Sequence, residues 1–157
     1  MNYLRLILII IFSSSSISCN KKTGRNQDYL PPLEISISKD LESDYEIYNL
    51  IISAEENVNR YSDKIEEIII NGEKLFNTNS DKSSLSSELK KTNVMINFYS
   101  NCTNLQNVTE QFNKHIIDLK VANKLNEKQA LELRNINKQY KHRIDILEKK
   151  YEDFYKR

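Results

Sequence analysis

The apolar residues between positions 47 and 75 recur at alternating intervals of four and three, which is the spacing of one face of a long helix. This seam consists of Ile47, Ile51, Ala54, Val58, Tyr61, Ile65, Ile68, Gly72 and Leu75. Gly72 is its weakest position, because glycine in a helix interior costs backbone entropy. We therefore expect the helix to end near Asn71 and Gly72, with an irregular last turn through Phe76.

A second amphipathic helix is expected to start among the serines of residues 83–87, whose hydroxyls can cap exposed backbone amides. Its apolar stripe consists of Met95, Phe98, Cys102, Leu105, Thr109, Phe112, Ile116 and Leu119. Leu85 and Leu89 precede this stripe out of phase with it.

A third helix is expected to follow Asn126, which together with Gln129 resembles a capping box. Its stripe consists of Leu133, Ile136, Tyr140, Ile144, Leu147, Tyr151 and Phe154. Three amphipathic helices joined by short links predict an all-α fold, namely an elongated antiparallel three-helix bundle with coiled-coil-like seams.

Helix-breaking residues are almost absent from the bundle. After the two prolines at positions 31 and 32, the chain has a single glycine. We expect residues 19–39 to form a disordered tether that passes into an extended segment, and residues 40–157 to form the bundle. Leu33, Ile35 and Ile37 alternate as in a strand, but no partner strand is predicted. This segment is therefore expected to pack along the bundle.

The chain begins with a pattern typical of an export signal. Arg5 precedes the apolar residues 6–12, which are followed by four serines and then by Ile17, Ser18 and Cys19. The apolar run is too short for a spanning helix, which needs roughly 20 residues. We therefore expect residues 1–18 to be removed as a signal peptide.

The run Ser16-Ile17-Ser18-Cys19 resembles the lipobox of bacterial lipoproteins, although that family usually has Leu at the first position and Gly or Ala at the third. Lipoboxes that depart from the usual pattern in this way are typical of spirochaetal lipoproteins. The Lys-, Asn- and Ile-rich chain is also similar to their small helical surface proteins, including those of Borrelia. The resemblance implies that Cys19 carries a diacylglycerol thioether and that its new amine is acylated. The alternative is a plain secretory signal cut near Ser18.

Net charge and cysteine content bear on nucleic-acid binding and on disulfide formation. The chain has 23 basic and 22 acidic residues, and loss of Arg5 with the signal balances the two. A neutral, exported chain is not expected to bind nucleic acid. Only Cys102 remains if Cys19 is acylated, so no intramolecular disulfide is expected.

The charges are distributed unevenly between the helices. Residues 40–75 are strongly acidic and residues 134–157 are basic. The first and third helices can lie side by side and neutralise each other. Alternatively, the basic residues form a strip for a sulfated glycan or another anionic ligand. The residues of this basic strip are Lys138, Lys141, Arg143, Lys149 and Lys150, with His142 among them.

Patterns that carry catalysis are not evident. The two glycines lie too far apart for a phosphate-binding loop, and no Cys-x-x-Cys or His-x-x-x-His occurs. Cys102 and His115 lie on one predicted helix, about 20 Å apart by helical rise, which is too far for a nucleophile pair. The acidic doublets at positions 55–56 and 66–67 are expected to be solvated. We expect no enzyme activity, no cofactor and no metal site.

The sequence thus predicts a lipoprotein at the outer membrane surface, attached through N-terminal acyl chains. Its expected role is a non-catalytic binding module, with a host protein or a sulfated glycan as the candidate partner. The alternative is a periplasm-facing structural or assembly lipoprotein that pairs its helices with a partner or with a second copy of itself.

Overall fold

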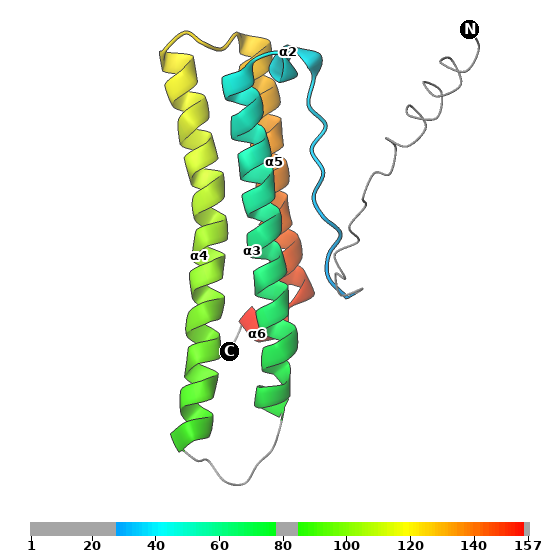
Figure 1. Ribbon diagram of the computed structural model, residues 1–157, viewed down its shortest axis with the longest axis vertical. Helices are drawn as coiled ribbons and strands as arrows, with labels where there is room; N and C mark the ends of the chain where they lie inside the picture. Colours follow the sequence, from blue (N-terminus) through cyan, green and yellow to red (C-terminus); the bar gives the residue numbers. More distant parts are fainter. Residues whose placement is uncertain (1–27, 78–84, 156–157) are drawn as a thin grey trace, which may run out of the picture.

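The computed structural model describes residues 28–77 and 85–155. Its helices are α2 (Lys39–Glu42), α3 (Tyr45–Asn77), α4 (Leu85–Val121), α5 (Glu127–Lys150) and α6 (Glu152–Tyr155). The three long helices form an elongated bundle in which α4 runs antiparallel to both α3 and α5, and no strand occurs in the described ranges (Figure 1). The predicted all-α three-helix bundle is therefore confirmed. The expected signal peptide, Cys19 and the start of the tether lie outside the described residues.

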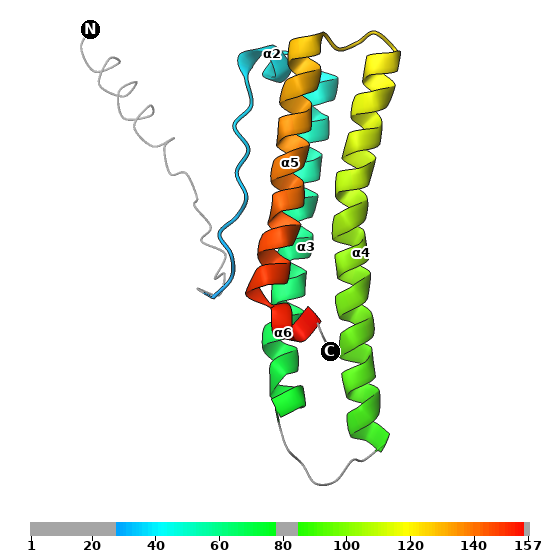
Figure 2. The same cartoon turned by 180° about the vertical axis from the view of Figure 1, so that it is seen from behind.

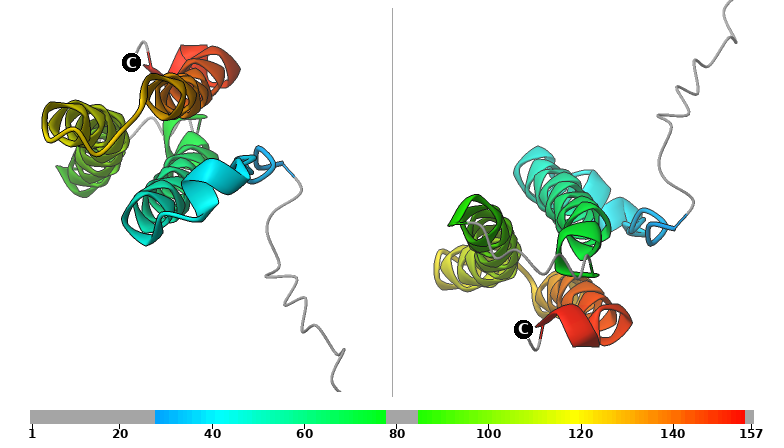
Figure 3. Two further views of the ribbon diagram at one scale, coloured as in Figure 1. Left: turned by 90° about the horizontal axis from the view of Figure 1, so that it is seen from above. Right: turned by 90° about the horizontal axis from the view of Figure 1, so that it is seen from below.

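Residues 28–38 form an extended segment, which we call the strap. The strap runs along the bundle to α2 at the end where α3 begins (Figures 1 and 2). Seen along the bundle axis, it lies on the side of α3 away from α4 (Figure 3). Leu33, Ile35 and Ile37 are partly buried against the core, so the extended segment does pack along the bundle as expected.

Helix α3 buries the predicted seam in its first half and a broader face in its second half. Ser62, Glu66 and Ile69 are fully buried beside the expected Ile65, whereas Leu75 is 36% exposed. The buried face widens because α5 and the strap cover a second side of α3 there.

Helix α3 continues through Gly72 to Asn77, so the expectation that it ends at Gly72 was wrong. Glycine is needed at this position because α3 and α4 approach each other closely here. A Cβ atom at position 72 would lie 2.9 Å from Val94 Cγ1 on α4 and 3.6 Å from the Phe154 ring. Gly72 therefore lets α4 and the C-terminal turn come close to α3.

Helix α4 buries its predicted stripe. Phe98, Leu105, Thr109, Phe112, Ile116 and Leu119 are buried. Met95 and Cys102 are partly buried and pack against this core. The link to α5 contains Asn123, whose left-handed φ of 55° is a conformation that asparagine adopts more readily than most residues.

Helix α5 starts with the predicted capping box. The Asn126 side chain accepts from the Gln129 N–H at 2.9 Å, and Gln129 Oε1 accepts from the Asn126 N–H at 3.0 Å. Further along α5, the buried Tyr140 donates its hydroxyl to the Ile51 carbonyl at 3.0 Å, and its ring packs edge-on against Phe112. These contacts fix α5 against both other helices.

The short helix α6 closes one end of the core. Its Phe154 is 2% exposed and packs edge-on against Phe98 and Phe76, with ring centroids 5.0 and 5.7 Å away. The chain turns at Tyr151 to place this ring between α3 and α4.

Substitution at Gly72 tests the close approach of α3 and α4. We expect Gly72→Ala to lower the free energy of unfolding by about 1 kcal/mol, because the stiff Val94 side chain cannot move aside. In a Val94→Ala background the same change should instead raise it by roughly 0.5 kcal/mol, since alanine is the better helix former.

Urea unfolding of the four proteins in this double-mutant cycle measures both values. A Gly72→Ala effect of the same sign in both backgrounds would contradict the steric role of Val94.

Candidate binding surfaces

The strap is fastened to the bundle by the buried carboxylate of Glu66, whose side chain is 0% exposed. Its two oxygens accept from the Leu30 N–H at 2.9 and 3.0 Å, and Oε1 also accepts from Lys150 Nζ at 2.9 Å and the Tyr151 hydroxyl at 2.8 Å. A carboxylate is tolerated in such a place only when its lost hydration is replaced in this way. The expectation that Glu66 is solvated was therefore wrong, because groups distant in sequence cover it.

Arg143 fastens the neighbouring part of the strap. Its side chain donates from Nη1 to the Pro31 carbonyl at 2.8 Å, from Nη2 to the Leu30 carbonyl at 3.4 Å and from Nε to Ser62 Oγ at 3.2 Å. Ser62 in turn donates to the Val58 carbonyl. The guanidinium thus links the strap, α5 and α3. We call Glu66, Arg143, Lys150 and Tyr151 the clamp.

Further along, side chains replace the strand partner that the strap lacks. Asn59 accepts from the Leu33 N–H at 2.7 Å and donates to the Leu33 carbonyl at 2.8 Å. Glu55 accepts from the Ile35 N–H at 3.2 Å. Glu132 accepts from both the Ser38 N–H and its hydroxyl, at 3.0 and 2.8 Å. The strap backbone is therefore bound by amide and carboxylate side chains of α3 and α5.

Burial shifts the pKa of two groups that contact or flank the strap. Desolvation raises the pKa of Glu55 above its ordinary 4.5, and repulsion from Glu34 and Glu56 adds to this. Desolvation also raises the pKa of Tyr151, as does its hydrogen bond to Glu66. The Tyr151 hydroxyl therefore remains a proton donor to Glu66 over the whole physiological range.

The predicted basic strip is not a continuous exposed surface. Arg143 is only 5% exposed and belongs to the clamp, so its expected place in a ligand-facing strip was wrong. Lys150 is likewise engaged, by Glu66 and by the Asp28 carbonyl. Lys138, Lys141 and Lys149 are exposed, together with the acidic Asp145 and Glu148 on the same helix. The positive potential of this surface is weaker than the sequence suggested.

The expected neutralisation of α3 by α5 takes the form of the pair Glu66–Lys150, with a distance of 2.9 Å, in which the carboxylate is buried and the Lys150 side chain is 32% exposed. Exposed ion pairs also join Lys124 to Glu46 at 2.7 Å and Lys128 to Asp40 at 2.6 Å at the other end of the bundle. Such exposed pairs each contribute roughly 0.2–1 kcal/mol.

The candidate reactive residues are not brought together. Cys102 is partly buried, and His115 is exposed and hydrogen-bonded to the Gln111 carbonyl of its own helix. Both lie on the unbroken α4, so the helical rise separates them by about 20 Å. His142 is exposed, 3.8 Å from Asp145. Within the described ranges, no group of three His, Cys, Asp or Glu residues could hold a metal.

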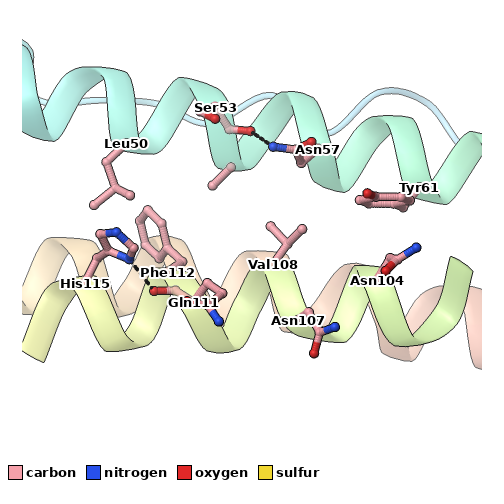
Figure 4. Close-up of a pocket in the computed structure, with 11 residues that line it drawn as sticks. Leu50, Ser53, Asn57, Tyr61, Asn104, Asn107, Val108, Gln111, Phe112 and His115 are labelled. Carbon is pink, nitrogen blue, oxygen red and sulfur yellow. Dashed lines mark hydrogen bonds between the residues drawn. The ribbon is translucent and has the colours of Figure 1, made fainter. Parts of the chain in front are cut away.

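An open groove lies between α3 and α4. Its central cavity of about 320 Å³ is lined by Leu50, Ser53, Ala54, Asn57 and Tyr61 of α3 and by Asn104, Asn107, Val108, Gln111, Phe112 and His115 of α4. Leu50, Val108 and Phe112 point into the space between the helices (Figure 4). An adjoining cavity of about 560 Å³ shares Leu50, Ser53 and His115. A third of about 400 Å³ lies further along the same two helices, between Ile68 and Val94.

Helix α4 also carries apolar residues on its outer face. Leu85, Leu89, Ile96 and Tyr99 are 78, 56, 59 and 51% exposed. With the exposed Thr92 and Thr103 they follow 4,3,4,3,4 spacing, which is a second coiled-coil-like seam. This spacing is visible in the sequence, in which Leu85 and Leu89 are out of phase with the buried stripe. They instead begin the outer seam.

Replacing Glu66 tests the clamp. We expect Glu66→Gln to lower the free energy of unfolding by about 2–3 kcal/mol, because Lys150 loses its counter-charge and the Leu30 N–H loses one acceptor. Hydrogen exchange at the Leu30 amide should accelerate. Urea unfolding and exchange measurements on the full chain give the two values.

The exposed neighbour Glu67 provides the matched control, and Glu67→Gln should change stability by less than about 0.5 kcal/mol. Equal effects of the two substitutions would rule out a special role for the buried carboxylate.

Comparisons with known proteins give no assignment for this chain. No protein-family model matches it, and no curated protein or solved structure is significantly similar to it. Among the described helices, none has the length and apolar character needed to cross a bilayer.

Proposed function

We propose that this protein is a membrane-anchored surface lipoprotein whose helical bundle is a non-catalytic binding module for a host or partner macromolecule. The observation that carries the proposal is the export-signal pattern that ends in the lipobox-like run at Cys19. Two or three acyl chains would hold the protein firmly, since each buried methylene contributes about 0.8 kcal/mol.

The strap supports this proposal, because it would limit how far the bundle moves from the anchor. Residues 20–27 separate Cys19 from the strap, and a stretch of this length spans at most roughly 30 Å. The clamp binds the start of the strap at Leu30 and Pro31. The bundle would therefore remain near the membrane.

The open surfaces of the bundle support a binding role. The groove between α3 and α4 and the outer seam of α4 both expose apolar side chains. Exposed apolar side chains that follow one another along a helix face are typical of an interaction site. The three exposed lysines of α5 are a weaker candidate for a sulfated glycan, because Asp145 and Glu148 are exposed beside them.

A second candidate function is the structural or assembly role, in which two copies pair through α4. The specific observation that favours it is the outer seam from Leu85 to Tyr99, since a heptad seam on one helix can pack against its own copy. The long seam of α3 does not support this role, because most of it is buried within the monomer.

The anchor is tested by exchanging each cysteine separately. We expect Cys19→Ala to abolish incorporation of labelled fatty acid and to move the protein from the detergent phase to the aqueous phase, because the thioether can no longer form. Cys102→Ala, the matched control on α4, should retain both properties. An unlabelled wild-type protein, or a labelled Cys19→Ala variant, would contradict the proposal.

Protease treatment of intact cells then separates surface from periplasmic placement. Rapid digestion of the native protein is expected for a surface lipoprotein. Protection until the outer membrane is opened would favour the structural alternative.

The pairing of α4 is tested by sedimentation of the full chain in density-matched detergent. If the structural candidate holds, the wild type forms dimers, and Leu89→Glu with Ile96→Glu raises the dissociation constant at least about tenfold, or ~1.4 kcal/mol. The exposed Asn93→Glu on the same helix serves as the control and should leave the dimer intact. A wild-type monomer at about 100 µM, a concentration at which even weak specific pairing is detectable, would exclude this candidate.

A further inference from the structure

We propose that the groove between α3 and α4 binds an extended, uncharged polypeptide segment of a partner through its main-chain amides. This inference deepens the proposed binding function by naming the site and the class of ligand, but it does not depend on the membrane anchor. Four observations carry it: the dimensions of the groove, its side-chain chemistry, its charge, and the way in which α3 already binds the strap.

The groove has the length of an extended peptide. On α3 its lining runs from Glu46 to Leu75, and on α4 from Val94 to Lys124 beyond the helix end. The part of α3 between Leu50 and Leu75 spans about 37 Å at the rise of an α-helix. Roughly eleven residues of extended chain cover that distance. The strap is an extended segment of the same length on the other side of α3.

The groove combines an apolar floor with amide side chains. Leu50, Val108 and Phe112 line its centre and Ile68 and Val94 its far part, so alternate apolar side chains of an extended peptide would find contacts. The amides that line its central and far parts are Asn57, Asn71, Asn97, Asn101, Asn104, Asn107 and Gln111. A side-chain amide offers one donor group and one acceptor, which matches the N–H and C=O of a peptide unit.

Several of these amides are available to a ligand. Asn57 and Asn101 donate to carbonyls of their own helices. Asn104, Asn107 and Gln111, in contrast, make no side-chain hydrogen bond to another described residue. All three line the central cavity at successive turns of α4, but the Asn107 side chain points away from α3, whereas Asn104 lies on the side toward Tyr61 (Figure 4). Asn104 and Gln111 are therefore the two amides that we expect to pair with peptide groups.

Charge complementarity selects an uncharged segment. His115 is the only titratable side chain besides Tyr61 in the lining of the central cavity. At one end of the groove Glu46 is already paired with Lys124 at 2.7 Å and Asp118 adds one carboxylate, and at the other end Lys64 and Glu67 offset each other in charge. A polyanion would gain nothing from this surface, and a basic peptide would find a counter-charge only at the Asp118 end.

The strap shows the same recognition within this molecule. A single amide side chain, Asn59, binds both the N–H and the C=O of Leu33 at 2.7 and 2.8 Å. Leu33 and Ile35 at the same time place their side chains against the core. Helix α3 thus binds an extended main chain on one side through amide and carboxylate groups, and it presents amides with apolar neighbours on the other.

A glycan fits the groove less well than a peptide. Sugar rings bind by stacking on exposed aromatic faces, and Tyr61 is the only half-exposed aromatic residue in the central cavity. The Arg60 guanidinium lies 4.8 Å and Lys64 Nζ 5.9 Å from the centroid of its ring, so these cations already occupy the π-face. The central cavity also has no carboxylate to accept from sugar hydroxyls.

The test is a selection of displayed twelve-residue peptides on the full chain in mild detergent. We expect enriched peptides that alternate apolar residues and lack charge. Their affinity should fall at least tenfold for Asn104→Ala with Gln111→Ala. The matched control is Gln106→Ala with Asn113→Ala, two exposed amides of α4 outside the groove, and it should bind as the wild type does. Equal thermal unfolding of the variants establishes that both are folded.

Main-chain recognition is tested by N-methylation of alternate amides in an enriched peptide. Two peptides are made, one methylated at the odd-numbered amides and one at the even-numbered amides. We expect one of the two to lose binding, because each methyl group removes a hydrogen-bond donor. The inference is overturned if no peptide depends on the two groove residues, if both methylated peptides bind normally, or if only an oligosaccharide panel binds in a groove-dependent manner. Since these measurements use isolated protein, they stand or fall separately from the acylation of Cys19.

Discussion

The arrangement of this protein depends on one buried carboxylate. Glu66 lies on the second half of α3, where an unpaired charge would destabilise the fold by several kcal/mol. Its ligands are the Leu30 N–H of the strap and the side chains of Lys150 and Tyr151 near the end of α5. The requirement to satisfy this group therefore determines where the strap lies and how the end of α5 meets α3. Arg143, which carries the opposite charge, stabilises the same junction by donating hydrogen bonds to the Pro31 and Leu30 carbonyls of the strap.

This junction gives α3 two different flanks. The flank beside α5 is closed by the strap, whose main chain is satisfied by Asn59, Glu55 and Glu132. The flank beside α4 remains open, because no described segment occupies it. Gly72 keeps the helices close at the far end of that groove, and Tyr140 holds α5 on the buried side. The same helix thus serves as an internal binding surface and as a candidate external one.

Helix α4 divides its apolar residues between two faces in a different way. Its inner stripe is continuous from Phe98 to Leu119, whereas its outer seam is confined to the half that contains Leu85 and Tyr99. The groove and the outer seam lie on different sides of α4, so a peptide ligand and a second copy of the chain would not compete for the same residues. The groove and the outer seam can therefore be occupied at the same time.

The sequence by itself determined the class of the fold and most of the core. The 3,4 spacing of apolar residues and the capping box at Asn126 are local properties, and they predicted the helices and most of their buried faces correctly. The local sequence pattern could not predict that Glu66 and Arg143 are buried, because their partners lie in segments distant in the chain. A charged group is buried only when such partners surround it. Gly72 was misjudged for a related reason. Its intrinsic helix propensity is poor, but Val94 on another helix comes so close that position 72 has no room for a Cβ atom. Only the tertiary structure decides that contact.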